Sequence, residues 1–250
     1  YAHWPSLDAA AQSFGGLVHA NDGLVTPAIA DIFPGTLMAL GVVSAIHSAQ
    51  RSGKGQFLDV GMYDAMMAFQ KSAVAQYGFT GKPNPAGLQR AMTLYPFDLF
   101  PTQDGRIAIA VGQPRHWDLL CAAMERADLM DDERSFSNEA RLANVDWVEE
   151  QICAWTQTQT RAEIMAKLDG AIPIGPVQTM ADIFADPHVS ARDMLETCSP
   201  AGDNPDIALA ASPIKFSQTP TTLYQRPPNL GEHNAEVLAE FGIEPSKRKD

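Results

Sequence analysis

Hydrophobic residues recur at helical spacing between residues 34 and 50, at Leu37, Leu40, Val43 and Ile46. This period predicts a helix, and the small residues between the large ones would allow close packing. The helix is apolar on most sides, so we expect it to be buried. Pro34 would lie in its first turn, where a missing backbone N–H costs little.

The chain that follows this helix alternates between strand and helix patterns. After a turn rich in glycine, residues 56–60 predict a short strand, and residues 63–77 predict another helix. Alternation of this kind is typical of an α/β layer.

A second pattern begins after a stretch rich in Gly and Pro at residues 78–86. Residues 95–100 and 107–111 predict two strands, joined across the turn signal Gln103-Asp104-Gly105. Helical patterns follow at residues 114–126, 139–157, 160–169 and 179–185. Four prolines then predict an extended chain, which ends in a short helix at 234–241. We therefore expect two structural units.

Charge is distributed unevenly, and it excludes some classes of partner. The 250 residues carry a formal net charge of −12, and no glutamate precedes Glu125. Such a chain repels a phosphate backbone, so we expect no nucleic-acid partner. The three cysteines lie far apart in no metal-binding spacing, which predicts reduced thiols in apolar cores and no metal site.

Membrane insertion is not predicted either. The most apolar stretch, residues 37–46, is shorter than the ~20 residues that a bilayer span needs. The first residues lack the basic and apolar runs of a signal peptide. These features predict a cytoplasmic protein.

Asp31 is the carboxylate most suited to chemistry, because it lies in an apolar stretch just before the predicted helix. One interpretation is an ordinary helix N-cap. The other is a poised nucleophile, since a helix N-terminus favours the ionised carboxylate. The residue pattern alone leaves both open.

Six blocks of the sequence, in order along the chain, resemble family III CoA-transferases, the group of carnitine-CoA and formyl-CoA transferases. The blocks are ADIFPG at 30–35, RSGKGQFLDVGMYDA at 51–65, DGRIAIA at 104–110, IPIGPV at 172–177, DPHVSAR at 186–192 and PNLGEHN at 228–234. Together they cover essentially the whole chain. The resemblance implies an α/β fold and makes the aspartate that matches Asp31 the catalytic nucleophile.

The domain organisation that this resemblance implies has three parts. Residues 1–82 would complete a Rossmann-like large domain, residues 83–198 would form a small α+β domain, and residues 199–250 would return to the large domain. Family chains are longer at the N-terminus, so we expect this chain to lack the first part of the large domain. Two family chains interlock, which implies a homodimer.

The chemistry implied by the resemblance is transfer of CoA from an acyl-CoA to a free carboxylic acid. It runs through an aspartyl anhydride and an aspartyl-CoA thioester. The CoA thioester is a substrate, and no tightly bound cofactor is implied. An inactive, truncated interaction module is the alternative from a different class.

The same superfamily contains 2-methylacyl-CoA racemases, which share the aspartate but transfer protons. Their motif places a histidine immediately before an upstream aspartate, and the matching pair here is Leu7-Asp8. Leucine cannot accept a proton, so this departure favours a transferase over a racemase or epimerase.

Two further residues are candidates for contact with the cofactor moiety. Asp8 is either an N-cap of a helix over residues 9–14 or an acidic group at the active site. Lys54 lies in a glycine-rich turn, where it either contacts a CoA phosphate or is simply solvated.

Overall fold

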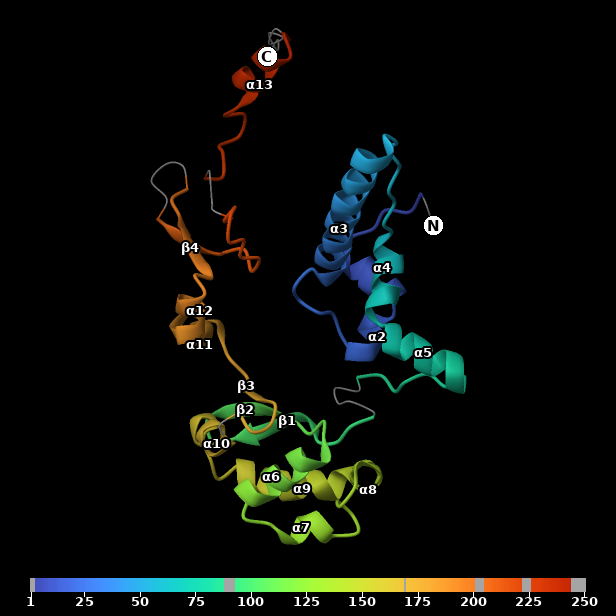
Figure 1. Cartoon of the computed structure of the whole chain (residues 1–250), viewed down its shortest axis with the longest axis vertical. Coiled ribbons are helices and arrows are strands. Elements are labelled where there is room, and N and C mark those ends of the chain that lie inside the picture. The colour runs from blue at the N-terminus through green and yellow to red at the C-terminus, as the bar shows by residue number, and fades with distance from the viewer. Residues whose placement is uncertain (1–2, 88–92, 169, 201–204, 222–225, 244–250) are drawn as a thin grey trace. The chain divides into compact units, whose positions relative to one another are not determined.

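The computed structural model describes residues 3–87, 93–168, 170–200, 205–221 and 226–243 (Figure 1). It divides into two compact units, Tyr1–Pro176 and Val177–Asp250. The domain boundaries expected near residues 82 and 198 stay predictions. Helices and sheets are mixed, and the predicted α/β class is confirmed.

The first unit begins with a group of five helices. They are α1 (Asp8–Phe14), α2 (Leu17–Asn21), α3 (Ile29–Ser52), α4 (Met62–Phe69) and α5 (Lys71–Thr80). The predicted central helix exists as α3, but it starts five residues before Pro34, which therefore lies inside the helix rather than in its first turn. Gly53 adopts a left-handed conformation at φ 70° and ends it.

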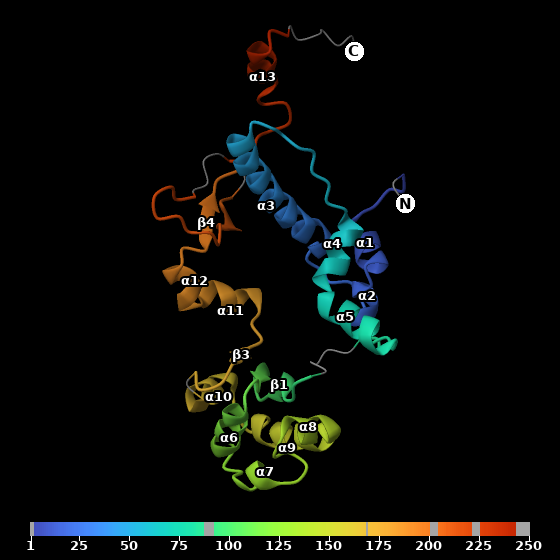
Figure 2. The same cartoon turned by 45° about the vertical axis from the view of Figure 1, so that its right-hand side comes forward.

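A small apolar core joins α1, α2, α3 and α4. Its buried members are Ala11, Leu17, Ala30 and Met66. Phe33 of α3 and Phe69 of α4 pack edge to face beside it, with ring centroids 5.2 Å apart. This core holds the N-terminal end of α3 (Figure 2).

The expectation that α3 is buried is wrong for this chain. Only Ala30 and Pro34 are buried in it, whereas Leu40 and Val43 are 65% and 66% exposed. The reason is that Ala30 and Phe33, which pack against the core formed with α1 and α4, lie near the start of α3, and Figure 2 shows the C-terminal part running away from those helices. With 24 residues, α3 is also long and apolar enough to cross a membrane by length and composition. The sequence analysis considered only residues 37–46 and so underestimated the length of this apolar helix.

Two local predictions after α3 are also corrected. Residues 56–60 form no strand, because no other strand of the described residues lies beside them to complete a ladder. The helix predicted over 63–77 is two helices, α4 and α5, which meet at Gln70.

The predicted hairpin is confirmed. Strands β1 (Phe97–Thr102) and β2 (Gly105–Ala110) pair antiparallel around the expected turn, with Thr102 opposite Gly105. A third strand, β3 (Ile174–Pro176), pairs antiparallel with β2 and was not predicted. Phe100, Ile107 and Ile109 are buried on one face of this sheet.

Five helices follow the hairpin, where the sequence predicts three. They are α6 (Pro114–Ala123), α7 (Asp128–Asp131), α8 (Asn138–Ala143), α9 (Val145–Thr156) and α10 (Arg161–Leu168). Figures 1 and 2 show α6, α8 and α9 on one side of the sheet, where the main core lies.

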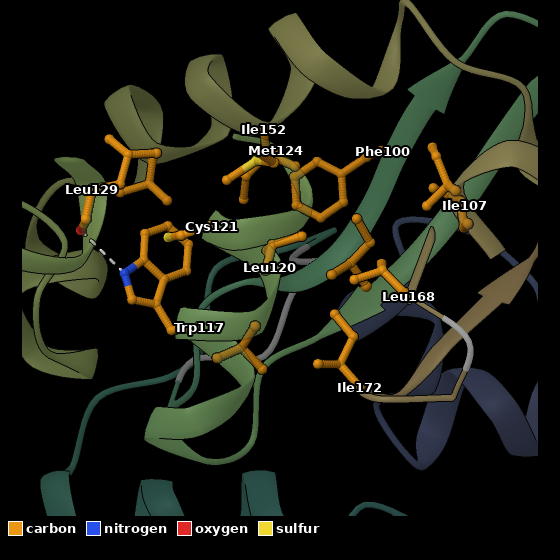
Figure 3. Packing of buried hydrophobic residues seen from close by; sticks show 14 of the residues in the cluster. Phe100, Ile107, Trp117, Leu120, Cys121, Met124, Leu129, Ile152, Leu168 and Ile172 are labelled. Carbon is orange, nitrogen blue, oxygen red and sulfur yellow. Dashed lines mark hydrogen bonds between the residues drawn. The ribbon is translucent and has the colours of Figure 1, made fainter. Parts of the chain in front are cut away.

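Trp117 is fully buried in this core, beside Cys121 and Leu129 (Figure 3). Its indole N–H donates to the backbone carbonyl of Leu129 over 3.2 Å, so its polar atom is satisfied. Cys121 is fully buried beside it, and burial raises the pKa of its thiol to about 12. A thiol that stays neutral at physiological pH is a packing residue, as the sequence suggested.

The second unit contains α11 (Met180–Ala185), α12 (Pro187–Ala191), the antiparallel pair β4 (Leu195–Cys198) and β5 (Ile207–Ala210), and α13 (Asn234–Glu240). Thr179 and Asp182 form a reciprocal capping box at the start of α11. The sequence analysis did not predict the β4–β5 pair. The final short helix is confirmed.

Candidate active site at the N-terminal end of helix α3

Asp31 is the third residue of α3, with its backbone N–H bonded to the carbonyl of Ala28 at 3.0 Å. The interpretation of Asp31 as the N-cap is therefore wrong, since Ala28 occupies that position. A carboxylate in the first turn still benefits from the positive end of a 24-residue helix.

The side chain of Asp31 is exposed rather than set in an apolar pocket. Its neighbour Ile32 is 59% exposed, and no hydrogen bond or ion pair reaches the Asp31 carboxylate from the residues that the structure describes. The described chain thus fixes the backbone of Asp31 but leaves its carboxylate uncovered.

Asp8 lies against the start of the same helix. One carboxylate oxygen, Oδ1, accepts from the backbone N–H of Ala30 at 2.9 Å. Asp8 is itself the first residue of α1, and Leu7 occupies the N-cap without a side-chain bond. The predicted N-cap role for residues 9–14 is therefore wrong: Asp8 caps α3, the helix that carries Asp31.

Gln12 completes this arrangement, although the sequence pattern did not single it out. Its Nε2 donates to Asp8 Oδ2 at 2.7 Å and to the carbonyl of Val25 at 3.0 Å. Its Oε1 accepts from the N–H of Val25 at 2.9 Å, and the side chain is fully buried. The available signal was a glutamine four residues after an aspartate on one face of a short helix.

The first backbone amides of α3 are already occupied. The N–H of Ile29 donates to the carbonyl of Pro27, that of Ala30 to Asp8, and that of Asp31 to Ala28. These groups are the usual donors at a helix N-terminus. Since each has a partner, the amides at the start of α3 are not free to stabilise an oxyanion.

The structure does not bring Lys54 to this site. Lys54 follows the C-terminal end of α3, and a rise of 1.5 Å per residue places it roughly 35 Å from Asp31 along the helix. Its backbone N–H bonds to the Ser52 hydroxyl in an exposed turn. Contact between Lys54 and a CoA phosphate stays a prediction.

The comparisons with known proteins give one consistent answer. The sequence profile of CoA-transferase family III matches residues 1–234, which is most of the chain. The chain belongs to this family. The resemblance in its six sequence blocks is thereby confirmed.

The family III relatives are longer than this chain. It is 38% identical over 245 residues to a succinyl-CoA:mesaconate CoA-transferase from Haloarcula hispanica, covering 96% of this chain and 61% of that protein. It is 36% identical over 217 residues to a succinate–glutarate CoA-transferase from Agrobacterium fabrum, covering 86% and 54%. The chain thus spans about 60% of the length of the first of these relatives.

A solved structure shares the family fold. A CAIB/BAIF family protein from Brucella suis superposes with a TM-score of 0.78 at 30% identity, covering 96% of this chain and 64% of that one. The agreement extends over nearly all of this chain.

Two apolar cavities of the family III chain bear on cofactor binding. One, of about 430 Å³, is lined by Trp4, Phe14 and Tyr63 among others, and the other, of about 420 Å³, lies on β1 and β2. Neither is lined by lysine or arginine, so neither offers a counter-charge to a phosphate. Across the described residues, no three His, Cys, Asp or Glu side chains form a metal-binding group.

Proposed function

We propose that this protein transfers CoA from an acyl-CoA to a free carboxylic acid, with Asp31 as the nucleophile. One observation carries the proposal: Asp31 lies in the first turn of α3, whose start is fixed by Asp8, in a chain of CoA-transferase family III. The identity of the acyl donor and acceptor is left open by the site.

The proposed reaction is a double displacement with no net use of water. A carboxylate oxygen of Asp31 attacks the thioester carbonyl, the C–S bond breaks, and CoA thiolate leaves behind a mixed anhydride. The thiolate attacks the Asp31 carbonyl, which releases the first acid and forms an aspartyl-CoA thioester. The second carboxylate then attacks this thioester, and the same steps in reverse yield the new acyl-CoA and free Asp31.

This chemistry requires that water be excluded from the anhydride. Asp31 is exposed in the described chain, so we propose that a further layer covers it in the active protein. The length of the relatives and the uncovered apolar side of α3 support this proposal. An interlocked homodimer is one source of such cover and is part of the proposal. Oxyanion donors must come from elsewhere, because the first amides of α3 are occupied.

We further propose that α3 is a core helix of a cytoplasmic protein rather than a membrane span. Its length and apolar composition fit either role. The superposition on the Brucella suis protein over 96% of this chain supports the first. Acyl-CoA and carboxylic acids are the proposed partners, and the CoA thioester is a substrate rather than a bound cofactor.

Replacement of Asp31 by Asn tests the proposal in the longest natural form of the protein. Succinyl-CoA with mesaconate or glutarate are suitable probes, since relatives are named for these acids. We expect Asp31→Asn to lose at least ~1000-fold in kcat, because removal of a nucleophile removes the covalent route. Hydroxylamine should attack the Asp31 carbonyl of the wild-type aspartyl-CoA thioester, release CoA thiol and leave a hydroxamate at residue 31, detected by mass spectrometry.

Asp118→Asn is the matched control, because Asp118 is an exposed carboxylate on α6. It should transfer CoA like the wild type. Near-normal turnover by Asp31→Asn would exclude the assignment. A wild-type protein that transfers no CoA and gives no adduct would instead favour the inactive interaction module.

The racemase alternative is separated by incubation of a 2-methylacyl-CoA in deuterated water. Leu7 stands where racemases have a base, so we expect no enzyme-dependent exchange of the 2-proton. Rapid exchange would replace the transferase proposal by the racemase one.

A further inference from the structure

The fully buried side chain of Gln12 makes one hydrogen bond to Asp8 on its own helix and two to the backbone of Val25, in the loop before α3. It lies on α1, between Asp8 and the backbone of Val25. Asp8 in turn accepts from the N–H of Ala30, one residue before Asp31. A continuous chain of hydrogen bonds therefore runs from Gln12 to the residue next to the proposed nucleophile.

We propose that Gln12 is a positioning residue for the CoA-transfer reaction. It holds the Asp8 carboxylate against the N–H of Ala30 and so sets the first turn of α3, which carries Asp31. Gln12 itself touches neither the proposed nucleophile nor any substrate. This inference rests on the proposed role of Asp31.

The chemistry of the site explains why a glutamine is required. Two acceptors, Asp8 Oδ2 and the carbonyl of Val25, face its amide NH₂, and one donor, the N–H of Val25, faces its amide oxygen. Only an amide side chain offers two donors and an acceptor at this length. Glutamate would lack the donors, and leucine would leave all three partners unsatisfied in a buried setting.

The positioning matters because small displacements of a reacting group are costly. A misplacement of about 1 Å can reduce a rate by roughly 100-fold. The N-terminal end of α3 packs on a small core of four buried residues, and this chain of hydrogen bonds adds to that packing in fixing the first turn. Loss of the Asp8 cap would free the Ala30 amide and the first turn.

The titratable surroundings of Gln12 are simple. Asp8 is the one charged group that bonds to it among the described residues. The elements packed against α1 carry other titratable groups: Asp31, His47 and Arg51 on α3, His19 on α2, and Tyr63 and Asp64 on α4. His19 bonds to the carbonyl of Asn84 instead, and His47 and Arg51 lie more than ~20 Å along α3 from its start.

Gln12→Glu is the test, measured as kcat against pH in the longest natural form of the protein. The new carboxyl would face Asp8, and the two would share one proton at low pH, which preserves the hydrogen bond. As pH rises the proton is lost, the two carboxylates repel each other, and the first turn of α3 shifts. We expect kcat to fall roughly 100-fold between low and high pH, with KM for acyl-CoA little changed.

A reciprocal exchange gives a second, independent test, in which Asp8→Asn is combined with Gln12→Glu. The amide introduced at position 8 donates to the carboxylate introduced at position 12, and the amide oxygen still accepts from the N–H of Ala30. We expect this double variant to regain activity over Gln12→Glu at neutral pH and to lose the pH dependence. A wild-type pH profile in Gln12→Glu, or no recovery in the double variant, overturns the proposal.

Gln70→Glu is the control for a merely structural loss, because Gln70 Nε2 also donates to a backbone carbonyl, that of Gly15, within the same helix group. It should lower stability without the new pH dependence, and the same pH dependence in both variants would overturn the proposal. The rate of amide hydrogen exchange at Ala30 adds a readout that does not depend on activity. Gln12→Glu should raise this rate above the wild-type rate measured at the same pH, and only at high pH. Unchanged exchange overturns the positioning role. If the wild type transfers no CoA while exchange at Ala30 rises in Gln12→Glu as expected, the proposed function is refuted and the positioning role of Gln12 on α3 is not.

Discussion

At the scale of single residues, Asp104 lies in the β1–β2 turn and also contacts a residue far away in the sequence. Its Oδ1 accepts from the backbone N–H of Arg161 at 2.8 Å and from the hydroxyl of Thr102 at 3.1 Å. Its Oδ2 pairs with the Arg161 guanidinium at 3.3 Å. The sequence identified the turn but not this link from the β1–β2 hairpin to the start of α10.

These bonds predict a pH-dependent effect of Asp104→Asn on stability. The backbone hydrogen bond from Arg161, with smaller help from Thr102 and the Arg161 side chain, lowers the pKa of the Asp104 carboxyl below 3.8. A lowered pKa in the folded state stabilises the protein above the ordinary carboxyl pKa, and the contribution is lost as pH falls through the lowered value. Asp104→Asn should therefore reduce Tm at pH 7 and much less near pH 3.

Thermal unfolding across this pH range checks the prediction. Glu133→Gln is the control, since Glu133 is exposed and has no hydrogen bond among the described residues. A Tm difference for Asp104→Asn that stays constant from pH 7 to pH 3 would contradict the role of the charge.

At the scale of elements, the contact between α1 and α4 depends on Gly15 at the end of α1. A Cβ built on Gly15 would clash with Cβ of Met66, which is fully buried. The φ of Gly15 is −75°, so its requirement is steric rather than conformational. The glycine allows the two helices to close over the end of α3.

We therefore predict that Gly15→Ala destabilises the helix group by about 1–3 kcal/mol through overpacking. Urea unfolding of the chain measures this change. Gly35→Ala is the matched control in α3, where nothing lies within 4 Å of the added methyl group. Alanine should stabilise that helix by about 0.5–1 kcal/mol. Equal effects of the two substitutions would disprove the steric argument.

The elements were predicted unevenly, and the reason is physical. The β1–β2 hairpin and most helices of residues 114–185 follow from local turn chemistry and apolar spacing, so the sequence located them. The segment 56–60 has a strand pattern but no strand, because pairing needs a neighbour from elsewhere in the chain. The break at Gln70 and the early start of α3 depend on packing against α1, which no local pattern reports.

At the scale of the whole molecule, α3 presents an apolar side that the described residues leave uncovered. Leu40, Val43 and Ile46 are each more than half exposed on it. Exposed apolar surface of this extent favours association. The relatives are longer than this chain, and the proposed function therefore includes further protein that covers α3.

This proposal predicts that the 250-residue chain alone binds CoA weakly and associates with itself. A net charge of −12 offers no diffuse attraction to a polyanion, and the two apolar cavities described above lack basic residues. Calorimetric titration with CoA and light scattering should be compared with a form of the protein extended to the full family length. Equally tight binding by the short chain would place the CoA site within these residues and contradict the prediction.

The sequence by itself determined the family and the α/β class, because these depend on ordered motifs and local spacing. It also singled out Asp31 as the proposed nucleophile, and that role stays a prediction. Only the tertiary structure decided what holds that aspartate. Asp8 and Gln12 lie 23 and 19 positions before Asp31 in the printed sequence, and no local pattern links them to it. Their hydrogen bonds to Ala30 and Val25 form only when α1 packs against the start of α3, where burial makes each unsatisfied polar group costly.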